Sequence, residues 1–248
     1  MKLKEYKGLN YVYTFIIILI LWQILGMALG NPILPTPLNI LINIFKNFQK
    51  EIGIHILYSL QRIFLGILLT LLIGVPIGIL MGYFRKADIV LSPILYFSYP
   101  VPKIAMLPII MLLFGLGELT KITMIFLITF FPIVVNIRDE VKNMPEEVFF
   151  PMHSLGSSKF EIIKEIIMPG IIPAILTSLR IGIGTAISVL FFTENYGTEY
   201  GMGYFIMDSW MRINYIQMYS GILILSMIGL IFFIAIDVLE SLLCPWKS

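Results

Sequence analysis

The chain has 248 residues, of which 58% are hydrophobic and only 13% are charged. Soluble domains carry about a quarter of charged residues, so this composition excludes an ordinary soluble protein. A net charge of +2 is too small to indicate a nucleic-acid partner. The single cysteine, Cys244, excludes an internal disulfide, and two histidines in separate segments give no support for a metal site.

Long stretches of the chain contain no charged residue at all. They are 8–45, 63–84, 122–137 and 213–236. A helix needs about 20 apolar residues to cross a bilayer, whereas the strands of a barrel would alternate over about ten residues. The continuous apolar runs therefore predict an all-α membrane protein with about six transmembrane helices. The predicted spans are about 11–29, 57–83, 89–113, 119–137, 169–192 and 217–241.

The third predicted span contains several prolines in its middle and is expected to be broken, because proline removes a donor and clashes with the preceding turn. Segment 37–52 has apolar residues at helical spacing but is too short to span, so it should lie at the interface or against the bundle. The chain then divides into an N-terminal part, 1–56, with the first span and this short helix, and a core, 57–248, with the remaining spans.

Lysine and arginine in the connections predict the orientation. With the N-terminus inside, segments 1–10, 84–88, 138–168 and 242–248 hold ten of these residues, against four in the outer connections. The sequence thus predicts a multi-pass protein of the cell membrane with both termini in the cytoplasm.

Small residues recur every four positions on two of the predicted spans. They are Gly66, Gly74, Gly78 and Gly82 on the second span and Ala174, Ser178, Gly182 and Ala186 on the fifth. Such residues let helix backbones approach closely in lipid. We expect both stripes to serve packing inside one bundle, with a subunit interface as the alternative.

The longest predicted cytoplasmic connection, 139–168, is called the coupling segment below. Pro145 followed by two glutamates is typical of a helix start, and Gly156 of a helix stop. Ser158 with Glu161 forms the pattern of a capping box, which begins a second helix that should run to Pro169. Two short helices with an apolar edge bury little by themselves, so this segment needs a partner.

The run LGSSKFEIIKEIIMPGIIPAIL, which starts at Leu155, resembles the coupling motif of ABC import permeases. Gly156 falls on the glycine of the motif and Pro169 on its proline. The E-A-A of the motif is replaced by Phe150, Pro151 and Met152. Three further runs, SLQRIFLGILLTLLIGVPIGILMGYFRKAD, YPVPKIAMLPIIMLLFGLGELTKI and YGMGYFI, are similar to the nitrate, sulfonate and taurine import permeases.

This resemblance implies a type I importer-like bundle that is not an enzyme and holds no cofactor, and that moves a small anion inward by alternating access. The implied partners are a second copy of the chain, expected as a homodimer, cytoplasmic ATP-binding subunits and an extracytoplasmic substrate-binding protein. ATP would be hydrolysed in the partner, since the chain contains no G-x-x-x-x-G-K-S/T. The residues expected to couple to the ATPase are Met152, Ser154, Leu155, Gly156, Ser157, Ser158, Phe160 and Pro169.

Lys103 lies deep in the broken third span, and charged residues at membrane depth usually face a wet cavity. We therefore expect it to line the substrate pathway and attract an anion, together with Pro100, Pro102 and Glu194. The alternative is that Lys103 reaches to the interface or pairs with an acid such as Glu194. Arg62 and Arg180 are expected to be structural and paired.

Two other functions fit a polytopic chain. A secondary transporter driven by an ion gradient would commonly show an internal repeat, and none is evident between the two halves of the sequence. An intramembrane enzyme would need a nucleophile with its base, or a metal set, which two separated histidines do not supply.

Overall fold

The computed structural model describes residues 2–247, without the side chains of 2–12, 14, 15 and 247. Within this part of the chain every regular element is a helix, which confirms the predicted all-α class. The main helices are α1 Lys2–Leu29, α2 Pro37–Asn47, α3 Gly53–Tyr83, α4 Arg85–Ser98, α5 Leu107–Phe114, α6 Glu118–Lys142, α7 Phe150–Ser154, α8 Lys159–Ile162, α9 Met168–Thr193, α10 Met202–Met211 and α11 Tyr215–Leu243.

Four helical runs among the described residues are long and apolar enough to cross a membrane. They are Pro37–Tyr83, Glu118–Lys142, Lys159–Thr193 and Tyr215–Leu243. A fifth crossing is obtained if α4 and the run Lys103–Phe114 form one span bent by 84°, as the prolines predicted. The first predicted span, 11–29, falls on α1, of which Ile16–Leu29 is the apolar stretch with described side chains.

Helix α6 is the centre of the bundle, with α3 on one side and α9 on the other. A Cβ on Gly66 would lie 2.5 Å from Ile125 Cγ2, and a Cβ on Gly82 would lie 2.5 Å from Val141 Cβ. Only glycine therefore permits this approach of α3 to α6. On the other side, the Asn136 amide donates to Ser178 Oγ at 2.5 Å. Both stripes of small residues pack inside one bundle, as expected.

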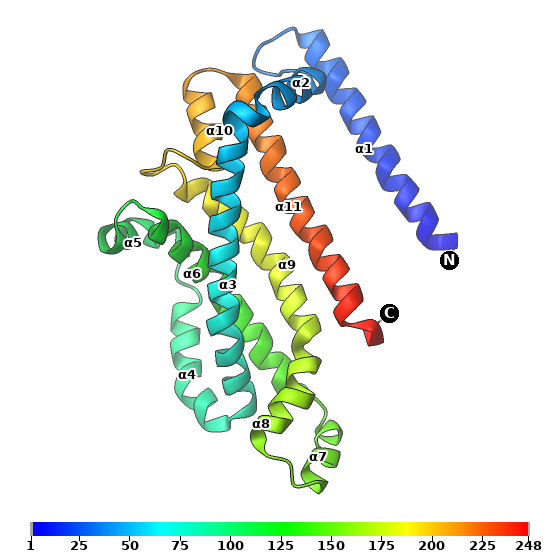
Figure 1. Cartoon of the computed structure of the whole chain (residues 1–248), viewed down its shortest axis with the longest axis vertical. Helices are drawn as coiled ribbons and strands as arrows, with labels where there is room; N and C mark the ends of the chain where they lie inside the picture. The colour runs from blue at the N-terminus through cyan, green and yellow to red at the C-terminus, as the bar shows by residue number, and fades with distance from the viewer. Residues whose placement is uncertain (1, 248) are drawn as a thin grey trace.

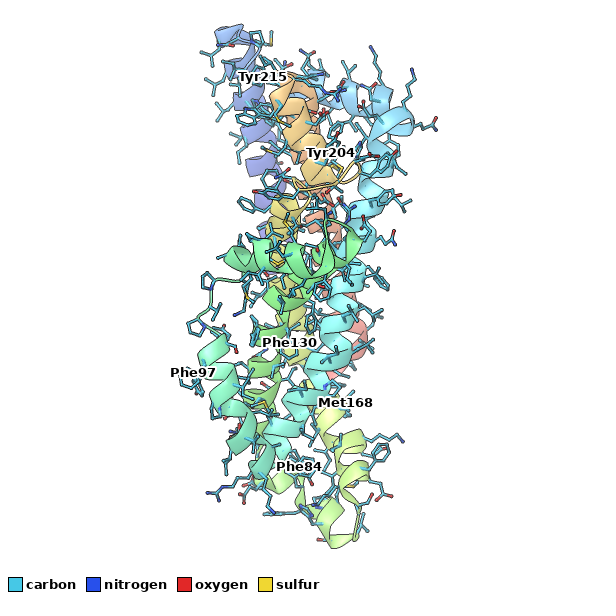
Figure 2. The ribbon with its side chains drawn as sticks, turned by 90° about the vertical axis from the view of Figure 1, so that its left-hand side faces the viewer. Phe84, Phe97, Phe130, Met168, Tyr204 and Tyr215 are labelled. Atoms are coloured by element: carbon cyan, nitrogen blue, oxygen red, sulfur yellow. The ribbon has the colours of Figure 1, made fainter. Side chains whose placement is uncertain are left out.

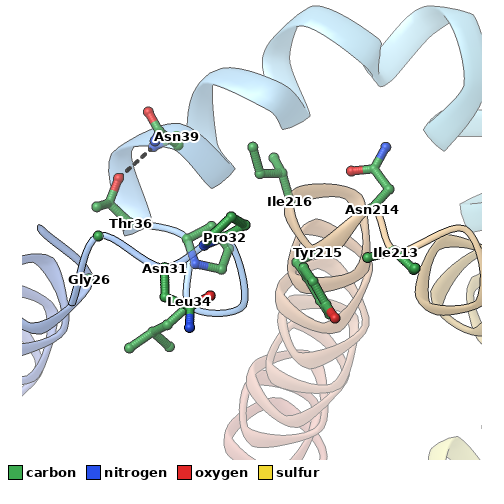
Figure 3. A pocket seen from close by; sticks show the side chains of 12 residues that line it. Gly26, Asn31, Pro32, Leu34, Thr36, Asn39, Ile213, Asn214, Tyr215 and Ile216 are labelled. Atoms are coloured by element: carbon green, nitrogen blue, oxygen red, sulfur yellow. Dashed lines mark hydrogen bonds between the residues drawn. The ribbon is translucent and has the colours of Figure 1, made fainter.

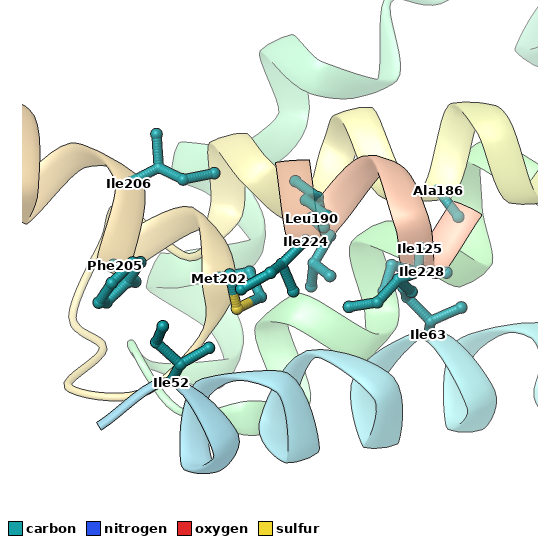
Figure 4. Close-up of a cluster of buried hydrophobic side chains, with 11 residues drawn as sticks. Ile52, Ile63, Ile125, Ala186, Leu190, Met202, Phe205, Ile206, Ile224 and Ile228 are labelled. Atoms are coloured by element: carbon teal, nitrogen blue, oxygen red, sulfur yellow. The ribbon is translucent and has the colours of Figure 1, made fainter. Parts of the chain in front are cut away.

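Apolar side chains from several helices fill the bundle in the half that holds α10. Figure 4 shows Ile63 of α3, Ile125 of α6 and Leu190 of α9 meeting Ile224 of α11 and Met202 of α10. Helix α10 is an element that the sequence analysis did not predict. Burial of its apolar face on the other helices stabilises it despite its short length.

Segment 37–52 lies against the bundle. Ile40 is fully buried, and the Asn43 amide donates to Ser220 Oγ of α11 at 3.0 Å. A π-helical turn, η1 Phe48–Ile52, joins α2 directly to α3. The helical run therefore continues across residue 56, and the division of the chain at 56/57 stays a prediction.

The bundle has two distinct ends (Figure 1). The end that carries α7 and α8 is called the coupling end here, and the end that carries α2 and α10 is called the far end. A cavity of about 510 Å³ opens at the far end, between the α1–α2 connection and the start of α11. Figure 3 shows Thr36, Asn39, Asn214 and Tyr215 around it, with Ile213 in a left-handed conformation at φ 58°.

Candidate functional site

The first half of the coupling segment is less regular than predicted. A 3-10 turn, η3 Glu146–Val148, is followed by α7, which has only five residues. Pro151 explains the break, because proline has no backbone N–H to donate to a carbonyl of the preceding turn. The helix expected from Pro145 to Gly156 is therefore split in two.

Gly156 and Ser158 adopt the local structures that their types predicted. Gly156 has φ +70°, and the amides of Gly156 and Ser157 donate to His153 O at 3.1 Å and to Met152 O at 3.0 Å. This pattern closes a helix at a glycine. The Glu161 amide donates to Ser158 Oγ at 3.3 Å, and the Ser158 amide donates to Glu161 Oε2 at 2.7 Å, which completes a capping box.

The prediction that the second helix ends at Pro169 is wrong. Helix α8 continues through a π-helical turn, η4 Ile163–Ile167, into α9, so that Lys159–Thr193 is one helical run. Pro169 stands in the first turn of α9, where a missing N–H is tolerated. The coupling segment is therefore continuous with a membrane-spanning helix: helical backbone, and not a flexible hinge, joins the two.

The coupling segment has an anchored face and an exposed face. Phe149 and Met152 pack against a buried cluster that includes Ile162 and Val141. On the outside, Leu155 is 81% exposed and Phe160 is 73% exposed. The anchored face fixes the position of the segment, and the exposed face offers apolar side chains to a partner.

Ionic contacts hold the coupling segment and the turn between α3 and α4 together. Asp88 accepts from Arg138 Nε at 2.7 Å and from Lys142 Nζ at 2.5 Å, which ties α4 to α6. The Lys159 ammonium lies 5.5 Å from the ring centroid of Phe84, a residue that Figure 2 shows at the coupling end. A cavity of about 380 Å³ opens beside these contacts, lined in part by Tyr83, Lys142 and His153.

Lys103 is placed at the break of the third span, together with Pro100 and Pro102. Its ammonium donates to Ser98 O and, at 3.0 Å, to Val101 O, and it lies 4.3 Å from the ring centroid of Phe131. Ser98 O belongs to the end of α4, where a helix leaves acceptors unpaired, and Val101 O belongs to the connection that follows. The described contacts of Lys103 are therefore with the backbone and a ring, and none is with Glu194.

Glu194 belongs instead to a charge cluster with Arg62 and Glu118, in which Glu194 and Arg62 are buried and Glu118 is half exposed. Arg62 Nη1 donates to Glu194 Oε1 at 2.6 Å, and Arg62 Nε and Nη2 donate to the two oxygens of Glu118 at 2.6 and 2.5 Å. The expectation that Arg62 is paired is confirmed, as it is for Arg180, which contacts Asp237 and Glu240. No local pattern of residues indicates the partners of Arg62, since they lie 56 and 132 residues away along the chain.

The arrangement of the described side chains includes no metal site. Within the described residues, no three of the side chains that ligate metals gather closely enough to hold an ion. Its features are a close-packed bundle, a broken span, an exposed apolar edge at one end and buried charges toward the other. These features define the class of membrane-embedded transport subunits.

Comparison with known proteins identifies the family. Residues 74–245 match the family model of the inner membrane component of binding-protein-dependent transport systems, and the chain belongs to this family. It is 29% identical to the formylaminopyrimidine transport permease protein ThiX of Halalkalibacterium halodurans, over 99% of this chain and 98% of that protein. It is 30% identical to the putative aliphatic sulfonates transport permease protein SsuC of Bacillus subtilis, over 99% and 90%.

A solved structure confirms the predicted fold. The MetNI methionine ABC transporter in an inward-facing conformation matches with a TM-score of 0.66 and 15% identity, over 81% of this chain and 98% of that one. The predicted resemblance to ABC import permeases is thus confirmed, and the chain is a transport permease without enzymatic activity of its own. Nothing in these comparisons supports the alternative of a secondary transporter.

Proposed function

We propose that this chain is the permease of an ATP-driven importer in which two copies form a pathway, cytoplasmic subunits hydrolyse ATP and a binding protein delivers the solute outside. The observation that carries the proposal is the coupling segment, which is anchored to a spanning helix and exposes apolar side chains. The family description adds the dependence on a binding protein.

The exposed apolar edge of the coupling segment favours a protein partner in water over contact with lipid. Phe150, Leu155 and Phe160 are exposed, and Glu161 and Lys164 lie within the same short stretch. Burying an apolar side chain of this size contributes about 1.5–3 kcal/mol. Docking of three such side chains therefore supplies a substantial driving force for an ATP-binding subunit.

In this proposal both termini lie in the cytoplasm with the coupling segment, and the far end faces the binding protein. Binding and hydrolysis of ATP in the partner would move the coupling segment, and the permease would open alternately to each side. The residues proposed to transmit this movement are Met152, Ser154, Leu155, Gly156, Ser157, Ser158, Phe160 and Pro169.

For the solute we propose a small anion such as a sulfonate, taurine or nitrate. The sulfonate permease among the relatives and the cation Lys103 at the broken span support an anion. Pro100 and Pro102 would shape the pathway beside it, because they keep that stretch of backbone out of a regular helix.

Purification of the tagged chain from its native membranes tests the proposal. We expect an ATPase subunit with a G-x-x-x-x-G-K-S/T motif to co-purify and to hydrolyse ATP in a vanadate-sensitive way. Leu155→Glu should reduce the bound subunit at least tenfold, because it places a charge where an apolar side chain is buried. Trp210→Glu, the same kind of change at the far end, should leave the bound subunit unchanged.

Two results would refute the proposal. One is equal recovery of the ATPase with Leu155→Glu and with Trp210→Glu. The other is solute uptake into liposomes by this chain alone, without ATP, which would support the gradient-driven alternative.

A further inference from the structure

The charge cluster of Arg62, Glu118 and Glu194 lies at the end of the helical run that begins in the coupling segment. The run Lys159–Thr193 has 35 residues, which corresponds to about 50 Å of helix. It starts directly after the capping residue Ser158 and ends one residue before Glu194. A displacement of the coupling segment along the axis of this run would therefore also move Glu194.

Glu194 is completely buried, and both oxygens of its carboxylate accept hydrogen bonds. Besides Arg62, its carboxylate accepts from Ser59 Oγ at 2.8 Å and from the amide of Gly203 at 2.7 Å. Arg62 is 1% exposed and also donates to Tyr200 O at 2.7 Å. These bonds join the end of α9 to α3 and to the connection 194–203.

Glu118 and Lys121 extend the joint to α6. Glu118 binds Arg62 through both of its oxygens. Lys121 is buried, and its ammonium donates to Leu116 O and, at 3.4 Å, to Gly197 O of the connection 194–203. The connection is therefore held from α3 and from the start of α6.

The connection 194–203 lies directly against the ion pair of Arg62 and Glu194, and the glycine at position 201 allows this close approach. Gly201 has φ +142°, and a Cβ there would lie 2.4 Å from Glu194 Cδ and 2.6 Å from Arg62 Nη1. No other residue fits this position without displacing the ion pair. The backbone of the connection therefore lies in direct contact with the ion pair.

We propose that Glu194 is a positioning residue that clamps the connection 194–203 to α3 and α6, and that the cytoplasmic partner controls this connection through the helical run Lys159–Thr193. The proposal rests on the proposed function and adds the route by which ATP acts on the far end. A hydrophobic cluster of the same shape would stabilise a static joint at least as well as a buried ion pair. The buried charges thus indicate that the connection 194–203 must adopt one specific geometry when it contacts α3 and α6.

The single cysteine makes the proposal directly testable. In a Cys244→Ala background, Tyr196→Cys places one thiol on the connection, at a position whose native side chain is 50% exposed. The rate of labelling by a water-soluble maleimide is measured on the complete transporter in proteoliposomes. It is compared without nucleotide and after trapping with ATP and vanadate.

We expect trapping to change the labelling rate about five-fold or more, the usual range for coupled sites. In Glu194→Gln the labelling rate should become independent of ATP, while the ATPase subunit still co-purifies. Glu199→Gln, an exposed carboxylate on the same connection, should keep the full ATP response. Should Glu194→Gln fail to fold, Ser59→Ala, which removes one bond to Glu194, should reduce the response.

A labelling rate that ATP does not affect in the Tyr196→Cys parent would overturn the inference, as would a full ATP response in Glu194→Gln and Ser59→Ala. These outcomes differ from failure of the proposed function, in which no ATPase subunit co-purifies with any variant.

Discussion

Replacing Gly82 with alanine should weaken the packing of α3 on α6, whereas the same change at Gly74 should not. A Cβ on Gly82 would lie 2.5 Å from Val141 Cβ and 2.9 Å from the backbone oxygen of Arg138, which cannot rotate aside. A Cβ on Gly74 would have its nearest neighbours at 3.5 Å, which is ordinary contact. The two glycines share a helix and a face and differ only in the room available.

The expected magnitudes follow from these distances. Overpacking in a dense interior costs about 1–3 kcal/mol, and alanine gains about 1 kcal/mol over glycine in a helix. Gly82→Ala should therefore lower the free energy of unfolding by about 0–2 kcal/mol. Gly74→Ala should leave it unchanged or raise it by up to about 1 kcal/mol.

The buried thiol of Cys244 supplies the assay. Because it is the only cysteine and is buried, its reaction with a thiol-reactive dye on heating in detergent reports unfolding. The midpoint for Gly82→Ala should fall below that for Gly74→Ala. Equal midpoints, or a lower midpoint for Gly74→Ala, would refute the close approach of α3 to α6.

Three further predictions use single substitutions. Arg62→Met leaves Glu194 buried without its cation, which should cost about 3–5 kcal/mol and lower the midpoint in the thiol assay; an unchanged midpoint would contradict the buried pair. Ser158→Ala removes the cap of α8 at a cost of about 1 kcal/mol, so amide exchange at 159–162 should become about five-fold faster; unchanged exchange would show that the cap is not needed. Lys103→Met should raise the KM for an anionic solute about ten-fold if the ammonium attracts it, and Lys103→Arg should restore most of the affinity; unchanged uptake at low solute would leave Lys103 as a cap of α4 alone.

Local sequence signals were sufficient where the structure is decided within one turn. Gly156 predicted a left-handed helix stop and Ser158 a capping box, because both depend on neighbouring backbone groups only. The prolines near Lys103 predicted the break of the third span for the same reason. The apolar runs predicted most spans, since lipid imposes helix on any long apolar segment.

The sequence was insufficient where contacts between distant segments decide. Pro169 suits both the end of one helix and the first turn of another, and only the packing of α9 on α6 selects the second. Arg62 and Glu194 are 132 residues apart in the chain. A single sequence indicates that such an arginine needs an acid and does not show which one.

The packing of α6 also restricts where the molecule can move. Glycines 66, 78 and 82 of α3 touch α6 on one side, and the bond from Asn136 to Ser178 joins it to α9 on the other. Sliding of α6 against either neighbour would drive side chains into backbone, and close-packed interiors resist such deformation. Over this packed stretch the three helices should therefore keep their spacing, while the ends beyond it, Glu194 and the connection 194–203 among them, can still shift. A second place for movement is the break 98–103, where α4 and α5 meet at 84° and Lys103 holds the backbone by hydrogen bonds that can exchange. In a transport cycle we therefore expect the position of α5 relative to α4 to change more than any distance within the α3–α6–α9 core.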